Sequence, residues 1–401
     1  MRNRRRGPNS ARGIRVAILD HTGALGGAEL ALVRLLDATD ASSVTSHTIL
    51  FSEGPFAERL RQTAHAVEVL PLHEEIVAAG RESVGGSLWA AVANTVKVLP
   101  FAIRLGLHLR ELAPDVIHTT SLKADLIGVP ASWIARRPLV WHIHDRISPD
   151  YLPSAMVWLI RTLARYVPRH VLVNSAATAA TLPGVRNLTI AHPGFTPDQV
   201  GASPSAREAP TTPVVGILGR ISPTKGQLEF VRASARVLQR RPGVRFRIIG
   251  AALFSEQDYE ERVRQEVDAL GVGDAVEFAG FVADPAAALD ALTLFVHASG
   301  TPEPFGQVVV EAMIRGVPVV ATRGGGVTEI VQPDDDAEPL GWLVPPYDVV
   351  ALADAILEAL DHPDVARRRA EAAHRSAQER FPIERTAAAV SEVWRRVARG
   401  R

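Results

Sequence analysis

Short runs of aliphatic and β-branched residues alternate with helical patterns from one end of the chain to the other. This alternation is typical of repeated β-α-β units, which build a parallel sheet covered by helices. In the first half, the pattern predicts strands at 15–19, 46–51, 67–70, 116–118, 139–142, 170–173 and 188–191. The expected fold class is therefore α/β.

A proline-rich stretch without periodicity, residues 195–213, interrupts this alternation and is predicted to be a linker. The second half then repeats the pattern, with strands expected at 214–218, 245–249, 276–278, 294–297 and 318–321, and helices at 227–239, 257–270 and 306–315. We therefore expect two Rossmann-like domains, 14–194 and 214–380, with a ligand site at the carboxyl ends of their strands.

Charge and composition exclude several classes of protein. The 44 Lys and Arg residues balance 44 Asp and Glu residues, which argues against a general nucleic-acid binder. The chain has no cysteine, so disulfides, thiolate catalysis and iron–sulfur clusters are excluded.

Residues 1–13, with five arginines, are expected to form a disordered basic tail, and the apolar run 14–19 after them is too short for a signal peptide. We expect a cytoplasmic protein.

The first candidate ligand loop contains Gly26 and Gly27 and joins the first expected strand to a helix. Glycines there let backbone N–H groups approach a phosphate at the start of the helix. The spacing differs from the dinucleotide-binding fingerprint, and an ordinary strand-to-helix turn remains an alternative.

The second candidate loop carries two cations, Arg220 and Lys225, again between an expected strand and a helix. Two cations on a loop that opens a helix can converge on one anion, which the helix dipole also favours. Only three lysines occur in the chain, so Lys225 is an unusual choice for a solvated surface charge. A diphosphate is the expected ligand.

The third candidate is a pair of carboxylates, Glu303 and Glu311. Glu303 lies between two prolines on a loop after an expected strand, and Glu311 lies in the following helix among apolar residues. Carboxylates in such places accept hydrogen bonds from sugar or ribose hydroxyls. Each glutamate alone is also compatible with a helix-start charge or a salt bridge.

A glycine run at 324–326 provides a further strand-to-helix junction that could hold an anion through backbone N–H groups. The aspartates at 334–336 have the spacing of a metal-binding Asp-x-Asp motif but fall in a polar turn. We interpret them as a solvated loop and expect no metal.

Taken together, these motifs resemble the retaining glycosyltransferases of the GT-B fold, specifically glycosyltransferase family 4, also called the glycosyl transferases group 1. The resemblance covers nearly the whole chain and depends on the ordered set GGAE, GRISPTKG, FAGFV, PEPFG with a second Glu, and GGGVTEIV. It implies two Rossmann-like domains facing across a cleft. It also implies that residues 381–401 end in a helix that packs back on the first domain.

The resemblance assigns roles to individual residues. Arg220 and Lys225 match the pair of cations that holds the donor diphosphate. Glu303 matches the carboxylate near the transferred sugar, and Glu311 matches the carboxylate that binds the ribose. His144 matches a histidine near the sugar and acceptor, although His142, two positions away, leaves that assignment open. The implied catalytic residues are Arg220, Lys225, Glu303 and His144, and the implied donor-binding residues are Gly26, Gly27, Arg220, Lys225, Phe281, Val282, Glu303, Phe305, Gly306 and Glu311.

The expected function is transfer of a sugar from a nucleotide-sugar donor to an unidentified hydroxyl acceptor, with retention of configuration and without a cofactor or metal. A sugar-nucleotide epimerase or glycan phosphorylase of the same fold, and a non-catalytic nucleotide-sugar-binding subunit, are the alternatives. Segments 87–110 and 151–170 combine apolar and basic residues, which suits either peripheral contact with the inner face of an anionic membrane or core helices of the first domain. No nucleic-acid partner is expected.

Overall fold

The computed structural model describes residues 13–63, 65–72, 88–207, 210–252, 256–334 and 338–400, with only the backbone for 88–97. The chain forms two compact units. The N-terminal unit contains the residues up to Gly194 together with the segment from Ile383 onward, and the C-terminal unit is Phe195–Pro382.

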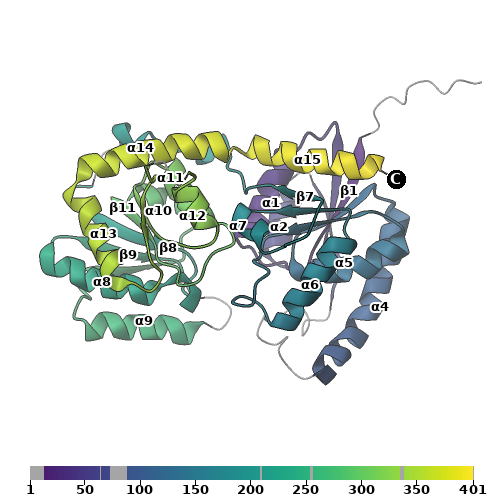
Figure 1. Ribbon diagram of the computed structural model, residues 1–401, viewed down its shortest axis with the longest axis horizontal. Helices are drawn as coiled ribbons and strands as arrows, with labels where there is room; N and C mark the ends of the chain where they lie inside the picture. Colours follow the sequence, from purple (N-terminus) through teal and green to yellow (C-terminus); the bar gives the residue numbers. More distant parts are fainter. Residues whose placement is uncertain are drawn as a thin grey trace, which may run out of the picture. The chain divides into compact units, whose positions relative to one another are not determined.

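The N-terminal unit is built on a seven-stranded sheet in the order β3-β2-β1-β4-β5-β6-β7. Figure 1 labels β1 and β7 of this sheet. All neighbouring strands are parallel. The strands are β1 (Ile14–Asp20), β2 (Val44–Leu50), β3 (Ala66–Val69), β4 (Val116–Thr119), β5 (Leu139–Ile143), β6 (His170–Val173) and β7 (Leu188–Ile190). Each coincides with a predicted strand to within two residues at either end.

Helices cover both faces of this sheet, as the continuous apolar runs of its strands require. On one face, α1 (Gly27–Asp37), α2 (Pro55–Arg61) and α15 (Ile383–Arg399) share a core with Val16 and Ile18 of β1. On the other, α4 (Leu88–Leu112), α5 (Leu122–Ala135) and α6 (Ser154–Tyr166) pack on Ala17 and Leu19. A short helix, α7 (Ala176–Ala180), joins β6 to β7.

The C-terminal unit contains a six-stranded parallel sheet in the order β10-β9-β8-β11-β12-β13. Its strands are β8 (Val214–Leu218), β9 (Arg245–Ile249), β10 (Val276–Gly280), β11 (Leu294–His297), β12 (Val319–Thr322) and β13 (Trp342–Val344), of which the last was not predicted. The helices are α8 (Gln227–Arg240), α9 (Gln257–Ala269), α10 (Pro285–Asp290), α11 (Gln307–Ile314), α12 (Gly326–Val331), α13 (Val349–Asp361) and α14 (Pro363–Arg380).

The described residues of the segment predicted as a linker, 195–207 and 210–213, belong to the C-terminal unit. It contains two short 3₁₀-helices, Pro197–Gln199 and Pro204–Ala206. Arg207 donates hydrogen bonds to the backbone carbonyls of Gly316, Asp290 and Leu292 at 2.9–3.0 Å. These bonds explain why a proline-rich, aperiodic sequence is nevertheless ordered on the surface of this unit.

The chain passes from one unit to the other at Gly194 and again at Ile383. The two passages lie side by side, because the Phe195 amide donates to the Phe381 carbonyl at 2.9 Å. Helix α15 then lies on the N-terminal unit. Its Trp394 is fully buried and donates to Nδ1 of His118 in β4 at 2.8 Å.

In both sheets the strand order reverses direction at one point, between β1 and β4 and between β8 and β11. Open parallel sheets bind ligands outside the carboxyl ends of the strands at such a point. The glycine loop containing Gly26 follows β1, the loop of Arg220 and Lys225 follows β8, and the loop of Glu303 follows β11. The topology thus brings the last two loops together in the C-terminal unit.

Candidate functional site

The loop after β8 is shaped by two glycines in conformations that other residues rarely adopt. Gly219 has φ +148° and Gly226 has φ +78°. A Cβ on Gly226 would lie 1.9 Å from the carbonyl oxygen of Ala298, which directly follows β11. The glycine therefore lets this loop approach the neighbouring one, and helix α8 begins immediately after it.

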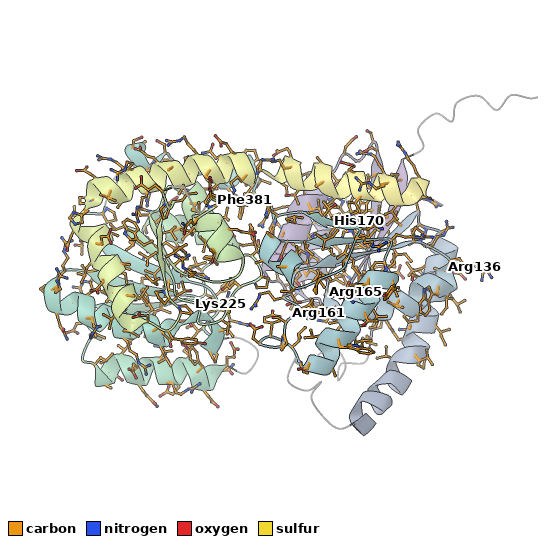
Figure 2. The ribbon with its side chains drawn as sticks, viewed as in Figure 1. Arg136, Arg161, Arg165, His170, Lys225 and Phe381 are labelled. Carbon is orange, nitrogen blue, oxygen red and sulfur yellow. The ribbon has the colours of Figure 1, made fainter. Side chains whose placement is uncertain are left out.

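Lys225 and Glu303 form an ion pair across this strand junction. Lys225 Nζ lies 2.6 Å from Glu303 Oε1, and both side chains are largely shielded, at 31% and 14% exposure. The hydroxyl of Ser299 donates to the same carboxylate oxygen at 2.6 Å, and His297 Nε2 lies 3.1 Å from it. Figure 2 labels Lys225 within the C-terminal unit.

These partners keep Glu303 ionised. Burial alone would raise the pKa of its carboxyl group, but the Lys225 ammonium and His297 hold that pKa well below its usual range. A lysine ammonium has three N–H donors, so Lys225 can serve Glu303 and still donate to a second acceptor. The pair therefore offers both a fixed negative charge and a partly available cation.

Arg220 is also close to a carboxylate. Its Nε lies 3.5 Å from Oε2 of Glu256, which precedes α9. Gln227, at the start of α8, holds the loop by donating to the Arg220 carbonyl at 3.0 Å. Arg220 and Lys225 therefore come from one ordered loop, and each is charge-balanced by a glutamate from another loop.

The glycine run supports the Glu303 loop. The Gly326 amide donates to the Glu303 carbonyl at 2.9 Å. Gly325 has φ +59°, and a Cβ on this residue would lie only 1.9 Å from the same carbonyl oxygen. The Gly324 amide donates to the Thr328 hydroxyl at 2.9 Å. The backbone amides of Gly324 and Gly326, which we expected to be able to hold an anion, thus make hydrogen bonds within the protein.

Helix α11 begins at this loop, and three of the predicted donor-binding residues lie in it or directly before it. Gly306 caps it with φ +111°, and Glu311 is half-buried one turn further along. Phe305 is 3% exposed and packs edge-to-face on Phe381, with ring centroids 5.5 Å apart. Because the Phe305 ring belongs to the core, only its backbone is available to a ligand.

The predicted nucleobase edge follows β10, two strands from β8. Phe281 is 81% exposed, and the neighbouring Val282 is half-buried. Gly280 has φ +68°, which turns the chain directly after the strand. An exposed aromatic ring beside a turn presents a flat apolar surface on which a base could stack.

In the N-terminal unit, Gly26 and Gly27 are exposed at the start of α1. Glu29 folds back over this helix start, and a Cβ on Gly26 would lie 2.7 Å from its Oε2. Burial, with a further contribution from the nearby Asp20, raises the pKa of Glu29 to about 7. Asp20 is itself buried and accepts a hydrogen bond from Thr120 Oγ1 at 2.6 Å.

His144 follows β5, and its ring lies against that of His142, with centroids 4.2 Å apart. Both line a small pocket with Leu32, Leu35 and other residues. Burial lowers the pKa of both histidines, that of His142 more strongly. Both rings are therefore neutral near pH 7.

Three polar residues in or beside these loops were not predicted from the sequence: His297, Ser299 and Glu256. Glu29 was included in the GGAE motif without a role of its own. His297 and Ser299 lie two positions apart at the carboxyl end of β11 and so point to the same side, which was a readable signal. No signal in the sequence pointed to Glu256, because its contact with Arg220 depends on where α9 begins. Asp335 and Asp336 lie outside the described residues, and within the described ranges no group of three or more His, Asp and Glu side chains is arranged to hold a metal.

Two family models match most of the chain. Residues 202–376 match the glycosyl transferases group 1, and residues 55–199 match Glycosyltransferase Family 4. The two matches meet near the boundary between the two units. The loops of Lys225 and Glu303 fall within the first model and His144 falls within the second, whereas the loop of Gly26 and Gly27 precedes both matched ranges.

Similar proteins and structures agree with the family models. The crystal structure of HepE from Anabaena in complex with UDP and glucose is 31% identical, has a TM-score of 0.80, and covers 95% of this chain and 99% of its own. The lipopolysaccharide core mannosyltransferase LpsB of Rhizobium meliloti is 31% identical over 78% of this chain and 95% of its own length. The phosphatidyl-myo-inositol mannosyltransferase of Mycobacterium leprae is 27% identical over 88% of this chain and 93% of its own length.

Proposed function

The chain belongs to the group 1 glycosyltransferases of the GT-B fold, enzymes of glycan biosynthesis, and we propose that its donor is a nucleoside diphosphate sugar. The observation that carries this proposal is the ion pair of Lys225 and Glu303 at the strand reversal of the C-terminal sheet, with Arg220 on the same loop as Lys225. HepE, which is similar over nearly the whole chain, has been solved with UDP and with UDP-glucose. A UDP-sugar is therefore the first donor to test.

We assign the two cations to the diphosphate. Charge develops on the leaving diphosphate as the bond to the sugar breaks, and preorganised donors stabilise that charge. Lys225 retains N–H donors beyond the one used by Glu303. Helix α8 begins two residues later, at Gln227, so the dipole of that helix adds to the positive field of the loop. These groups support a reaction in which protein cations, rather than a metal ion, neutralise the diphosphate.

The carboxylate of Glu303 suits the sugar. It is ionised, shielded from solvent and fixed by Lys225 and Ser299, so it can accept hydrogen bonds from hydroxyls of the transferred sugar. Glu311, within α11, is assigned to the ribose and Phe281 to the base. His144 or its neighbour His142 is the candidate contact for the sugar and acceptor in the N-terminal unit.

The proposed reaction retains the anomeric configuration. The bond between the anomeric carbon and the diphosphate oxygen breaks, and the acceptor oxygen bonds to the same face of that carbon. The acceptor proton passes to the departing phosphate oxygen, so the products are the glycoside and a nucleoside diphosphate. No separate general base is needed in this scheme.

The test begins with thermal unfolding of the purified chain in the presence of UDP-glucose, UDP-N-acetylglucosamine and GDP-mannose. A ligand that binds only the folded state raises the unfolding temperature, and at equal concentration the tighter ligand raises it more. The selected donor is then incubated with and without EDTA, and release of nucleoside diphosphate and the configuration of the released sugar are measured by NMR.

We expect slow hydrolysis with retention that EDTA does not change and that Lys225→Ala abolishes. Arg236→Ala, an exposed position on α8, is the matched control. Activity that requires added magnesium or manganese would refute the metal-free reaction. If the chain binds the donor but transfers its sugar neither to an acceptor nor to water, the result would instead support a non-catalytic subunit. Inversion of configuration at another carbon of the sugar would support an epimerase.

A further inference from the structure

Tyr347 has a backbone conformation that tyrosine rarely adopts. Its φ is +62°, and among the described residues of the C-terminal unit it is the one non-glycine residue with a positive φ. The residue belongs to a turn after β13, in which the Asp348 amide donates to the Pro345 carbonyl at 3.4 Å. Pro346 at the second position and a positive φ at the third are features of a type II turn, where glycine or asparagine is the usual third residue. A tyrosine here strains the backbone, and such strain collects at functional sites.

The ring of Tyr347 occupies the space that a side chain at residue 300 would need. A Cβ on Gly300 would lie 2.3 Å from both Cε1 and Cζ of the ring and 2.6 Å from its hydroxyl oxygen. Gly300 is buried, whereas Tyr347 is 60% exposed. The ring therefore lies against the backbone of Gly300, while much of the tyrosine faces solvent.

Gly300 belongs to the loop that carries Glu303. At one end of this loop, the hydroxyl of Thr322 in β12 donates to the Ser299 carbonyl at 2.7 Å. At the other end, the Gly326 amide donates to the Glu303 carbonyl at 2.9 Å. Gly300 lies between these two hydrogen bonds, and without a Cβ its backbone has more conformational freedom than that of other residues. Contact with the aromatic ring restricts that freedom.

The turn that carries the ring is fixed on both sides. Asp348 caps α13 by accepting a hydrogen bond from the Ala351 amide at 2.9 Å. Before the turn, the carbonyl of Val344 in β13 accepts from the Arg323 amide, which follows β12, at 2.7 Å. The Gly300 loop follows β11, two strands away from β13 in the sheet. Because neighbouring strands are about 4.8 Å apart, a large side chain is needed to reach it.

We propose that Tyr347 is a positioning residue for sugar transfer, whose ring holds the loop of Gly300 in the conformation that presents the Glu303 carboxylate to the transferred sugar. Ser299 directly precedes Gly300, and its hydroxyl donates to Glu303 Oε1 at 2.6 Å. A shift of Gly300 would therefore move a hydrogen-bond partner of that carboxylate. The inference rests on the proposed function, because that function assigns Glu303 to the sugar.

The first experiment compares Tyr347→Gly and Tyr347→Phe with the parent chain in donor hydrolysis, calorimetric titration with UDP, and thermal unfolding. Glycine accepts the positive φ but removes the ring, so relief of strain and loss of packing oppose each other, and the unfolding midpoint should stay within about 3 °C of the parent value. Turnover should fall about tenfold or more, because small displacements of positioning groups are costly in rate. The Kd for UDP should not change, since Lys225 and Glu303 keep their charges. Phenylalanine keeps the ring and should restore the turnover of the parent chain.

A second set of variants tests the contact itself. Gly300→Ala directs a methyl group at the ring and should lower both the unfolding midpoint and turnover. When Gly300→Ala is combined with Tyr347→Gly, the three atoms nearest to that methyl group are absent, so the midpoint should return to that of Tyr347→Gly alone. The matched control is Val350→Ala, which truncates an exposed side chain in the first turn of α13 and should leave all three measurements unchanged.

The results separate this inference from the proposed function. Parent-like turnover by Tyr347→Gly would overturn the positioning role alone, whereas a parent chain that turns over no donor would refute the proposed function and this inference with it. Equal loss of turnover in Tyr347→Phe and Tyr347→Gly would show that the hydroxyl contacts the substrate, and would also overturn the positioning role. So would a loss of midpoint from Gly300→Ala that persists when the ring is removed, because the ring and the loop would then not be in contact.

Discussion

Replacing Glu303 by glutamine should tighten binding of UDP while it lowers turnover. The substitution keeps the shape of the side chain but removes the negative charge that lies 2.6 Å from the Lys225 ammonium. A phosphate oxygen bound by the same ammonium would lie about 2.8 Å from it, which places the phosphate within roughly 5 Å of the carboxylate.

Two effects oppose each other in this variant. At an effective dielectric constant of about 20, two like charges roughly 5 Å apart repel by about 3 kcal/mol. Loss of the charged hydrogen bond that positions Lys225 costs about 1.5 kcal/mol. The repulsion is the larger, so Glu303→Gln should bind UDP about tenfold more tightly. Turnover should fall because the sugar hydroxyls lose a charged acceptor.

Isothermal titration calorimetry with UDP gives the affinity, and donor hydrolysis gives the turnover. The matched control is Glu266→Gln, which removes the same charge from a surface ion pair with Arg232 on the same unit. Its UDP affinity and turnover should both match the parent chain. Weaker UDP binding by Glu303→Gln would show that the carboxylate serves mainly to position Lys225, and would refute the electrostatic reasoning.

Three further substitutions test other parts of the structure. Gly325→Ala places a Cβ 1.9 Å from a carbonyl oxygen in a residue with φ +59°, so the midpoint of thermal unfolding and the rate of donor hydrolysis should both drop. Gly243→Ala, whose Cβ would have no atom within 4 Å, should change neither quantity. Trp394→Ala removes a fully buried ring and should cost about 3–5 kcal/mol in urea unfolding. The folded-state pKa of Glu29, about 7, exceeds its ordinary value of 4.5, so its stabilising contribution is present at low pH and is lost as pH rises through 7. Glu29→Gln should therefore flatten the pH dependence of unfolding between those values.

Most strands could be predicted because parallel strands buried on both faces are continuous apolar runs. Strand β13, Trp342–Val344, was missed because three residues carry no periodicity and its position depends on pairing with β12. The linker prediction for 195–213 followed from proline content alone. The hydrogen bonds of Arg207 that hold this segment on the C-terminal unit depend on tertiary structure.

The candidate site shows the same limit. The loops of Lys225 and Glu303 could be predicted, but their ion pair joins residues 78 positions apart and follows only from the adjacency of β8 and β11. Phe305 was predicted to bind the donor because it lies in the motif, yet its ring faces the core. A motif identifies a loop, whereas the direction of each side chain depends on packing.

The route of the chain through α15 has a consequence for synthesis on the ribosome. The N-terminal unit needs Trp394 to fill its core, and that residue follows the entire C-terminal unit in the sequence. The C-terminal unit can therefore complete its fold first, although domains usually fold in the order of synthesis. Until translation reaches α15, the side of the sheet on which Trp394 packs lacks one of its three helices. We therefore expect the nascent N-terminal unit to expose apolar surface at that stage.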